Sequence, residues 1–355
     1  MAGKKEIFIG TVGVGGENPV VIQSMTNTPA RDVPGTLNQI RRLQQAGCEL
    51  VRCALPEAGD LTAFKAIVAA SALPVIADIH FDHRLALAAM EAGAAGIRIN
   101  PGNIGSKRKV KEILDLAAER GVALRIGVNS GSLEKSCRHA DKPLVERLTT
   151  SLVDHVRFCE DHGFFNLKLS IKTTSVRDTI SAYQTIDKLL PYPLHLGLTE
   201  AGPFLPGTIK STLALGNLLL QGIGDTIRVS LTADPVQEVL VAGEILKALG
   251  LRRENLEIIS CPTCARSSVD LLGKIEEFQA KTAGFKPTRP LRVAIMGCEV
   301  NGPGEAGHAD LGLAFSVSLG YLFKEGKIIG KYTPEKAVDE LIALIKSMEK
   351  PDALL

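Results

Sequence analysis

The chain has 355 residues, of which 45% are hydrophobic and 4% aromatic, and its formal net charge at pH 7 is +2. A charge this close to zero and so few aromatic rings argue against nucleic acid as a partner, and no apolar run reaches the roughly 18 residues of a membrane span. Seven scattered cysteines and the lack of a signal-like apolar segment after Met1 favour a protein of the reducing cytoplasm.

Eight short β-rich runs alternate with segments that have helical apolar spacing. The predicted strands are Val20–Ser24, Leu50–Ala54, Val75–Ile79, Gly96–Asn100, Leu124–Asn129, Asn166–Ile171, Leu194–Thr199 and Ile227–Leu231. Glycines stand where the intervening helices would end, and the last of these helices runs from Pro235 to Leu249. Eight strand–helix units in succession predict a (β/α)8 TIM barrel over residues 1–251.

The pattern changes after Gly250, and we place a domain boundary near Leu251. Residues 252–355 predict a small α/β domain with a final helix that opens at Pro334. Its predicted strands and internal helix are Leu256–Ser260, Val269–Phe278 (helical), Leu291–Met296, Leu313–Ser318 and Tyr321–Tyr332, the last bent at Glu325-Gly326.

Polar side chains gather at the carboxyl ends of the predicted barrel strands, where barrels carry their reactive groups. Reading alternate residues there gives Arg52, Asp78, His80, Arg98, Asn100, Arg125, Asn129, Ser170, Lys172, His195, Thr199, Glu200, Arg228 and Ser230. Five cations from five strands suit a phosphate or diphosphate ester, because guanidinium groups match phosphate oxygens in pairs. Salt bridges around the barrel rim are the alternative explanation.

Other residues at this mouth have weaker indications. Glu200 is the best placed carboxylate for proton transfer, and His80 and His195 could act as acids or be structural. The segment Pro101–Ser106 could offer N–H groups to a phosphate, whereas Gly13–Gly16 lacks the layout of a dinucleotide site and is predicted as a turn.

Three cysteines form a second group. Cys261 and Cys264 are separated by Pro262-Thr263, and Cys298 follows the predicted strand Leu291–Met296, with Glu305 beyond a Gly-Pro-Gly turn. Three thiolates and a carboxylate favour an iron–sulfur cluster, although His308 could complete a zinc site instead. The other cysteines, Cys48, Cys53, Cys137 and Cys159, are expected to be small buried apolar residues.

These motifs resemble those of the 4-hydroxy-3-methylbut-2-enyl diphosphate synthases of the methylerythritol phosphate route. The resemblance is colinear over nearly the whole chain and rests on Ile97–Gly105, Arg125–Gly131, Leu194–Gly202, Gly224–Leu231, Cys261–Arg266 and Gly297–Ala306. Cys53 departs from the aliphatic residue expected at its position. The resemblance implies a barrel followed by a small α/β domain that binds a [4Fe-4S] cluster.

The resemblance also implies a role for each matching residue. Cys261, Cys264, Cys298 and Glu305 would ligate the cluster, and Glu200 would be the acid–base group. The residues implied to hold the diphosphate, or to lie beside it, are Arg52, Arg98, Asn100, Arg125, Asn129, Lys172, His195, Arg228 and Ser230.

The implied reaction is the ring opening of 2-C-methyl-D-erythritol 2,4-cyclodiphosphate with loss of water. It needs two electrons, which the cluster would relay from a reduced flavodoxin or ferredoxin. The family works as a homodimer, in which the barrel of one subunit meets the cluster domain of the other.

Two other hypotheses remain. In the first, Lys172 is a Schiff-base lysine of an aldolase-like barrel and the cysteines hold structural zinc. In the second, residues 252–355 are a zinc-ribbon module for nucleic acid, against which the absence of a basic, aromatic surface argues.

Overall fold

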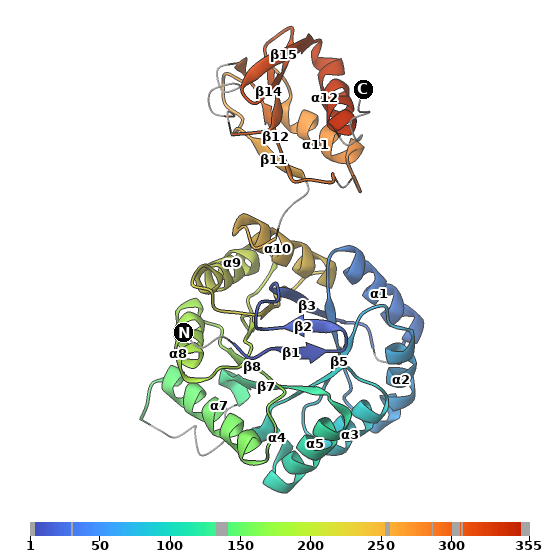
Figure 1. Cartoon of the computed structure of the whole chain (residues 1–355), viewed down its shortest axis with the longest axis vertical. Coiled ribbons are helices and arrows are strands. Elements are labelled where there is room, and N and C mark those ends of the chain that lie inside the picture. The colour runs from blue at the N-terminus through green and yellow to red at the C-terminus, as the bar shows by residue number, and fades with distance from the viewer. Residues whose placement is uncertain are drawn as a thin grey trace, which may run out of the picture. The chain divides into compact units, whose positions relative to one another are not determined.

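The computed structural model describes residues 4–29, 31–132, 141–252, 256–285, 287–299, 306 and 308–348. The chain divides into two compact units, Met1–Arg252 and Arg253–Leu355. Figure 1 shows strands ringed by helices in the first unit and a sheet with two helices in the second.

The first unit is a barrel of eight parallel strands, as the sequence predicts. The strands are β3 (Val21–Met25), β4 (Leu50–Ala54), β5 (Val75–Asp78), β6 (Gly96–Ile99), β7 (Ala123–Asn129), β8 (Leu167–Lys172), β9 (His195–Leu196) and β10 (Thr226–Ile227). They pair in the order β8-β7-β6-β5-β4-β3-β10-β9, and a parallel bridge between Leu169 and Leu194 joins the two ends. Strands β9 and β10 are shorter than predicted, because the residues that follow them leave the ladder and line a cavity.

Helices cover the outside of the barrel between successive strands. They are α1 (Val33–Gln45), α2 (Leu61–Ala70), α3 (His83–Glu91), α4 (Pro101–Ile104), α5 (Lys107–Arg120), α7 (Leu144–Asp161), α8 (Val176–Leu189), α9 (Phe204–Leu220) and α10 (Pro235–Ala248). Local sequence fixes their ends: Ser106 accepts the N–H of Lys109 at the start of α5, and Gly121 ends that helix with φ +66°. The segment that we predicted as a phosphate-binding loop begins with the single turn α4.

A hairpin of β1 (Ile7–Ile9) and β2 (Val12–Val14) closes the end of the barrel where the strands begin. Ile7, Ile9 and Val14 are buried against an apolar layer from the strands, which consists of Val21, Leu50, Ile76 and Ala123. The prediction of a turn at Gly13–Gly16 was therefore wrong for its first two residues, which belong to β2 because Val14 buries its side chain in the barrel.

The second unit is a five-stranded sheet in chain order. Its strands are β11 (Leu256–Ser260), β12 (Leu291–Met296), β13 (Leu311–Phe315), β14 (Gly320–Lys324) and β15 (Lys327–Tyr332). Strands β11, β12 and β13 pair in parallel, whereas β14 pairs antiparallel with both β13 and β15. Helices α11 (Leu271–Lys281) and α12 (Pro334–Met348) bury apolar residues such as Phe278 and Leu341 against the sheet. Among the described residues of the whole chain, no helix has the length and hydropathy required to cross a bilayer.

Candidate active site

A cavity of about 350 Å³ lies at the carboxyl ends of the barrel strands. Most of the polar side chains predicted for this mouth line it. They are Arg52, Asp78, His80, Arg98, Arg125, Asn129, Lys172, Thr199, Glu200, Arg228 and Ser230. The structure thus brings five cations from five different strands or strand ends into one cavity.

Three residues predicted for this mouth, Asn100, Ser170 and His195, do not line this cavity. The Asn100 side chain caps α4, where it accepts the N–H of Gly102 at 3.2 Å. His195 is fully buried one layer deeper in the barrel, beside Thr226 and below Lys172. Asn100 and His195 are almost fully buried outside the cavity lining, and the expectation that they contact substrate stays a prediction.

Asp78 neutralises part of the positive charge. Its carboxylate lies 3.6 Å from Nε of Arg52, 3.2 Å from Nη1 of Arg98 and 3.5 Å from Nε2 of His80. Burial alone would raise the pKa of Asp78, but the charge of Arg52, the hydrogen bond with His80 and the charge of Arg98 outweigh it and hold the pKa far below its usual value. Asp78 is therefore an ionised anchor for two of the arginines.

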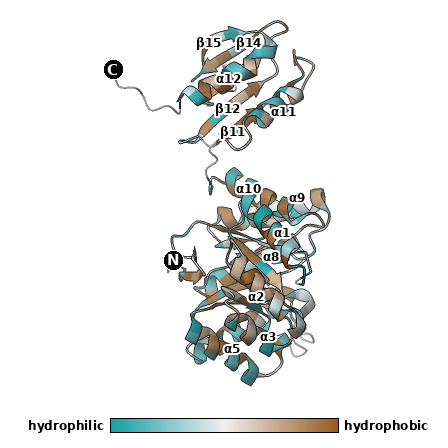
Figure 2. Cartoon of the chain, turned by 90° about the vertical axis from the view of Figure 1, so that its right-hand side faces the viewer, coloured by the Kyte–Doolittle hydropathy of each residue, from teal (hydrophilic) through white to brown (hydrophobic). Residues whose placement is uncertain are grey.

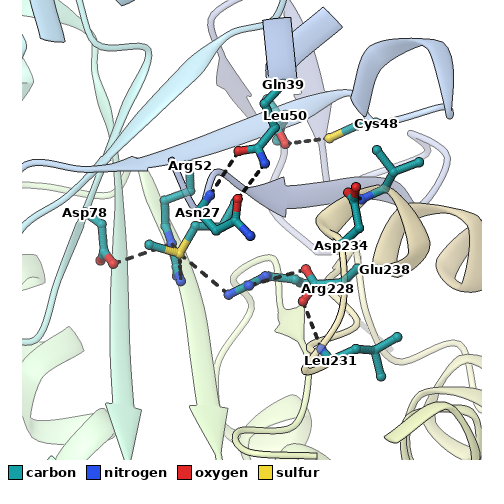
Figure 3. A network of polar contacts seen from close by, with 12 residues as sticks. Asn27, Gln39, Cys48, Leu50, Arg52, Asp78, Arg228, Leu231, Asp234 and Glu238 are labelled. Carbon is teal, nitrogen blue, oxygen red and sulfur yellow. Dashed lines mark hydrogen bonds and ion pairs between the residues drawn. The ribbon is translucent and has the colours of Figure 1, made fainter. Parts of the chain in front are cut away.

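Arg228 finds its counter-ion on helix α10. Its Nη2 lies 3.3 Å from Oε2 of Glu238, and Oε1 of that carboxylate accepts the N–H of Leu231 at 2.9 Å (Figure 3). Glu238 was not among the residues predicted for this site. A signal was present, because Glu238 shares the buried face of α10 with Pro235 and Val239, and a carboxylate on such a face needs a charged or hydrogen-bonded partner.

Arg125 lacks such an anchor among the described residues. Its side chain is buried, with 5% of the residue exposed, and its Nε and Nη1 have no hydrogen-bond partner there. Burial, and then the charges of Arg52 and Arg98, lower the pKa of Arg125 well below its ordinary value. A buried guanidinium without a counter-ion is costly, and an anionic ligand would offset that cost.

Lys172 is the second cation without a carboxylate partner in the described structure. Its Nζ lies 3.4 Å from Nε2 of His195, whose Nδ1 is 2.8 Å from Oγ1 of Thr226. Burial, and then Arg125 and Arg228, lower the pKa of Lys172 well below 10.5. The absence of a side chain at Gly197 makes room for it, since a Cβ there would lie 2.8 Å from the Lys172 amine.

A sixth cation, Lys168, is fully buried below the cavity and was not predicted. Its Nζ donates to Oε1 of Gln23 at 3.1 Å. Burial, and then the charge of Arg125, lower its pKa well below the usual value. The alternation Lys168, Ser170, Lys172 along β8 could have shown that all three face inward, but the sequence analysis considered only the strand end.

Glu200 reaches the cavity from the loop after β9. Its backbone φ is +54°, a conformation that is uncommon for residues other than glycine and that recurs at functional sites. Glu200 is exposed, so its carboxylate lies at the solvent-accessible part of the cavity lining.

The three predicted metal-binding cysteines lie at the ends of adjacent parallel strands. Cys261 follows β11 and Cys298 follows β12, and the N–H of Gly297 donates to Sγ of Cys261 at 3.4 Å. Cys264 is exposed, and the N–H of Arg266, followed by its side chain, lowers the pKa of the Cys264 thiol. N–H groups directed at sulfur favour thiolates, which is the state that an iron–sulfur cluster requires.

Glu305 and the turn before it lie outside the described residues, so its place beside the thiols stays a prediction. Within the described part of the chain, no three His, Cys, Asp or Glu side chains are close enough together to hold a metal ion. Three cysteines, two of which receive N–H groups at sulfur, are nonetheless a donor set that fits an iron–sulfur cluster.

The other described cysteines behave as predicted. Cys48, Cys53 and Cys159 are buried, whereas Cys137 lies outside the described residues. Burial raises the pKa of Cys48 to about 12, that of Cys53 to about 11 and that of Cys159 to about 12. Their thiols are therefore protonated and inert, in contrast to Cys264.

Solved structures share the barrel architecture. A dihydropteroate synthase of Xanthomonas albilineans aligns with a TM-score of 0.51 and 16% identity over 70% of this chain and 97% of that one. An N-acetylneuraminic acid synthetase of Leptospira borgpetersenii aligns with a TM-score of 0.50 and 15% identity over 79% of this chain and 98% of that one. At these identities the likeness shows the fold alone.

Curated relatives are far closer in sequence. Proteins named 4-hydroxy-3-methylbut-2-en-1-yl diphosphate synthase (flavodoxin) are 52% identical in Lawsonia intracellularis, over 92% of this chain and 90% of that protein, and 51% identical in Aquifex aeolicus, over 98% and 97%. The GcpE TIM-barrel domain matches residues 4–243, and the GcpE protein C-terminal domain matches residues 257–347. With both domains matched in order and half of its residues shared with these relatives, the chain belongs to the GcpE family of 4-hydroxy-3-methylbut-2-en-1-yl diphosphate synthases.

Proposed function

We propose that this chain reduces 2-C-methyl-D-erythritol 2,4-cyclodiphosphate to 4-hydroxy-3-methylbut-2-en-1-yl diphosphate, with ring opening and loss of water. The relatives' name gives the product, and the barrel cavity supports a diphosphate ligand. The observation that carries the proposal is Arg125, a buried guanidinium with two unpartnered nitrogens in a cavity lined by four further cations.

The side chains of the cavity have separate tasks in this proposal. Arg52, Arg98 and Arg228, which Asp78 and Glu238 orient before the ligand arrives, bind phosphate oxygens at the cavity wall. Arg125 and Lys172 supply the charge that no described carboxylate neutralises. Ser230 and Asn129 offer neutral hydrogen bonds, and Glu200 would transfer a proton to the hydroxyl that leaves as water.

In this proposal Cys261, Cys264, Cys298 and Glu305 hold a [4Fe-4S] cluster. Such a cluster supplies single electrons when it is bound. The word flavodoxin in the name of the relatives supports a flavodoxin as the electron donor, with ferredoxin as the other candidate. The competing Schiff-base hypothesis has one point in its favour, the low pKa of Lys172. Borohydride trapping of a keto substrate on Lys172 would support it.

Iron and acid-labile sulfide analysis tests the cluster. Anaerobically purified protein should contain about four of each per chain, and with dithionite and a flavodoxin it should convert the cyclodiphosphate to the linear diphosphate, detected by mass spectrometry. Cys298→Ser should lose most of the iron and nearly all turnover, because a serine oxygen is a poorer ligand for this iron.

Cys159→Ala is the matched control, since this thiol is buried in the barrel with a raised pKa. It should keep the iron content and the activity. An iron-free wild-type protein that still turns over the substrate would refute the cluster, and loss of iron in both variants would show that Cys298 has no special role.

We propose further that the chain forms a homodimer through helix α9. Leu205, Ile209 and Leu213 recur every fourth residue on this helix and are 66%, 52% and 58% exposed. Figure 2 shows the hydrophobic colouring of α9. A stripe of this kind on a helix is typical of a surface that another protein covers.

Ile209→Lys should convert the dimer to a monomer in multi-angle light scattering, because a charge would be buried in the interface. Phe8→Lys, at an exposed aromatic of the β1–β2 hairpin, should leave the mass unchanged. A dimer that tolerates Ile209→Lys would exclude this face.

A shared active site can be tested by co-expression of Arg125→Met and Cys298→Ser chains. Mixed dimers should have up to about half of the wild-type activity, because one intact barrel and one intact cluster domain remain on opposite chains. A statistical mixture, about half of which is mixed dimers, should regain up to about a quarter. No recovery in verified mixed dimers would mean that each chain works with its own cluster.

A further inference from the structure

A methionine sulfur lies between two of the arginines of the cavity. Met25 is the last residue of β3, and its Sδ lies 2.8 Å from Nη2 and 3.2 Å from Nε of Arg52. The same sulfur lies 3.8 Å from Nη1 of Arg228. The two arginines, with their carboxylate partners Asp78 and Glu238, are drawn in Figure 3.

These distances distinguish an acceptor from a space-filling side chain. Apolar contacts in a packed core are usually about 3.5–4.0 Å between heavy atoms, whereas two nitrogens of Arg52 approach the Met25 sulfur more closely than that. The neighbouring strand makes this possible, because Met25 pairs directly with Arg52 in the β3–β4 register. The thioether therefore serves as a weak hydrogen-bond acceptor for a buried cation.

The charge of this acceptor matters more than its strength. Arg52 already has Asp78 at 3.6 Å, and Arg228 has Glu238 at 3.3 Å. A third carboxylate in place of Met25 would hold both guanidinium groups but would cancel charge that an anion needs. A thioether is neutral, so it can hold the two groups while the cavity keeps its excess of positive charge.

We propose that Met25 is a positioning residue that sets the spacing of Arg52 and Arg228 and so favours ligands with two linked phosphates over a single phosphate. This inference rests on the proposed diphosphate-binding function of the cavity. A ligand with one phosphate can be bound by either arginine alone, whereas a diphosphate gains from both when their separation is fixed.

Calorimetric titration of the anaerobically purified full-length protein tests the inference, with inorganic pyrophosphate and orthophosphate as probes. Met25→Leu keeps the size of the side chain and removes the sulfur, so it should fold and melt normally. Its affinity for pyrophosphate should fall about tenfold, while that for orthophosphate should change less than about twofold. Met25→Gln restores a neutral acceptor and should recover part of the loss.

Met90→Leu is the matched control, because Met90 is a buried methionine of α3 that does not line the cavity. It should leave both affinities unchanged. If Met25→Leu binds both probes like the wild type, Met25 only fills space and the inference is overturned. Equal losses for both probes would overturn its effect on selectivity. A wild-type protein that binds no pyrophosphate would instead overturn the diphosphate site itself, and with it this inference.

Discussion

Arg125→Met should weaken the binding of inorganic pyrophosphate about 100-fold and at the same time raise the melting temperature of the ligand-free protein. The two effects have the same cause. The guanidinium is buried without a counter-ion among the described residues, beside Arg98 on the next strand and near Arg52. We therefore expect it to destabilise the free protein and to bind an anion strongly for the same reason.

The magnitudes follow from this burial. Removal of one partner of a buried charged contact costs about 2–5 kcal/mol, and about 3 kcal/mol corresponds to roughly 100-fold in affinity. Replacement of a buried charge by an apolar side chain of similar volume can stabilise a protein by about 1–4 kcal/mol, and each kcal/mol is worth about 2–4 °C in a domain of this size.

Arg108→Met provides the control in the same unit. The Arg108 side chain is 84% exposed and lies 3.8 Å from Glu112, which is 42% exposed, so its loss should change neither pyrophosphate affinity nor melting temperature appreciably. Calorimetry and differential scanning fluorimetry give the two numbers. An Arg125→Met protein that is less stable than the wild type would show that Arg125 is a structural ion-pair residue.

Pyrophosphate binding should take up about one proton per ligand, and Lys172→Met should abolish this uptake. The free protein disfavours the charged form of Lys172 by burial and by the charges of Arg125, Arg228, Arg52 and Arg98. The negative charges of a bound ligand reverse that effect and raise the pKa. Between the two pKa values the affinity should fall as the pH rises, by up to about tenfold per pH unit.

The lowered pKa of Lys172 has the opposite pH dependence for the stability of the free protein. The unfolded chain keeps the proton of Lys172 up to its ordinary pKa of about 10.4, whereas the folded, ligand-free chain releases it at lower pH. Folding therefore releases a proton in this window, and the contribution of Lys172 to the free energy of unfolding rises with pH. Titrations in two buffers of different ionisation enthalpy measure the proton uptake directly.

Lys111→Met, at an exposed lysine of α5, should take up protons like the wild type. Proton uptake that persists undiminished in Lys172→Met would assign it to another buried base, of which Lys168 and His195 are the candidates in the described structure. Lys168→Met would then identify which of the two is responsible.

The sequence predicted the barrel, its strand order and the inward-facing cations, because alternation along a strand determines which face a side chain occupies. It did not predict how far along the barrel axis each inward-facing side chain lies. His195 pairs in register with Thr226, which in turn pairs with Val21 of the apolar bottom layer, so an inward-facing residue on a short strand can lie too deep to line the cavity. Strand stagger, which no single segment encodes, decides this.

The partners of the cations were also beyond the sequence analysis. Met25 and Glu238 contact Arg228 across separations of 203 and 10 residues, and neither belongs to a motif of charged or catalytic residues. In the second unit, by contrast, the predicted bounds of β11 and β12 agree with the structure, because each strand is a mostly apolar run, with one charged residue at its second position, that ends next to its cysteine loop. Short-range patterns were therefore predicted well, and contacts made by the folded chain were not.

The β1–β2 hairpin has a consequence for turnover. Its apolar side chains close the end of the barrel where the strands begin, so a diphosphate that enters the cavity at the carboxyl ends of the strands must leave through the same opening. Substrate binding and product release then use one opening. Turnover can therefore be no faster than the dissociation of the trianionic product from these cations.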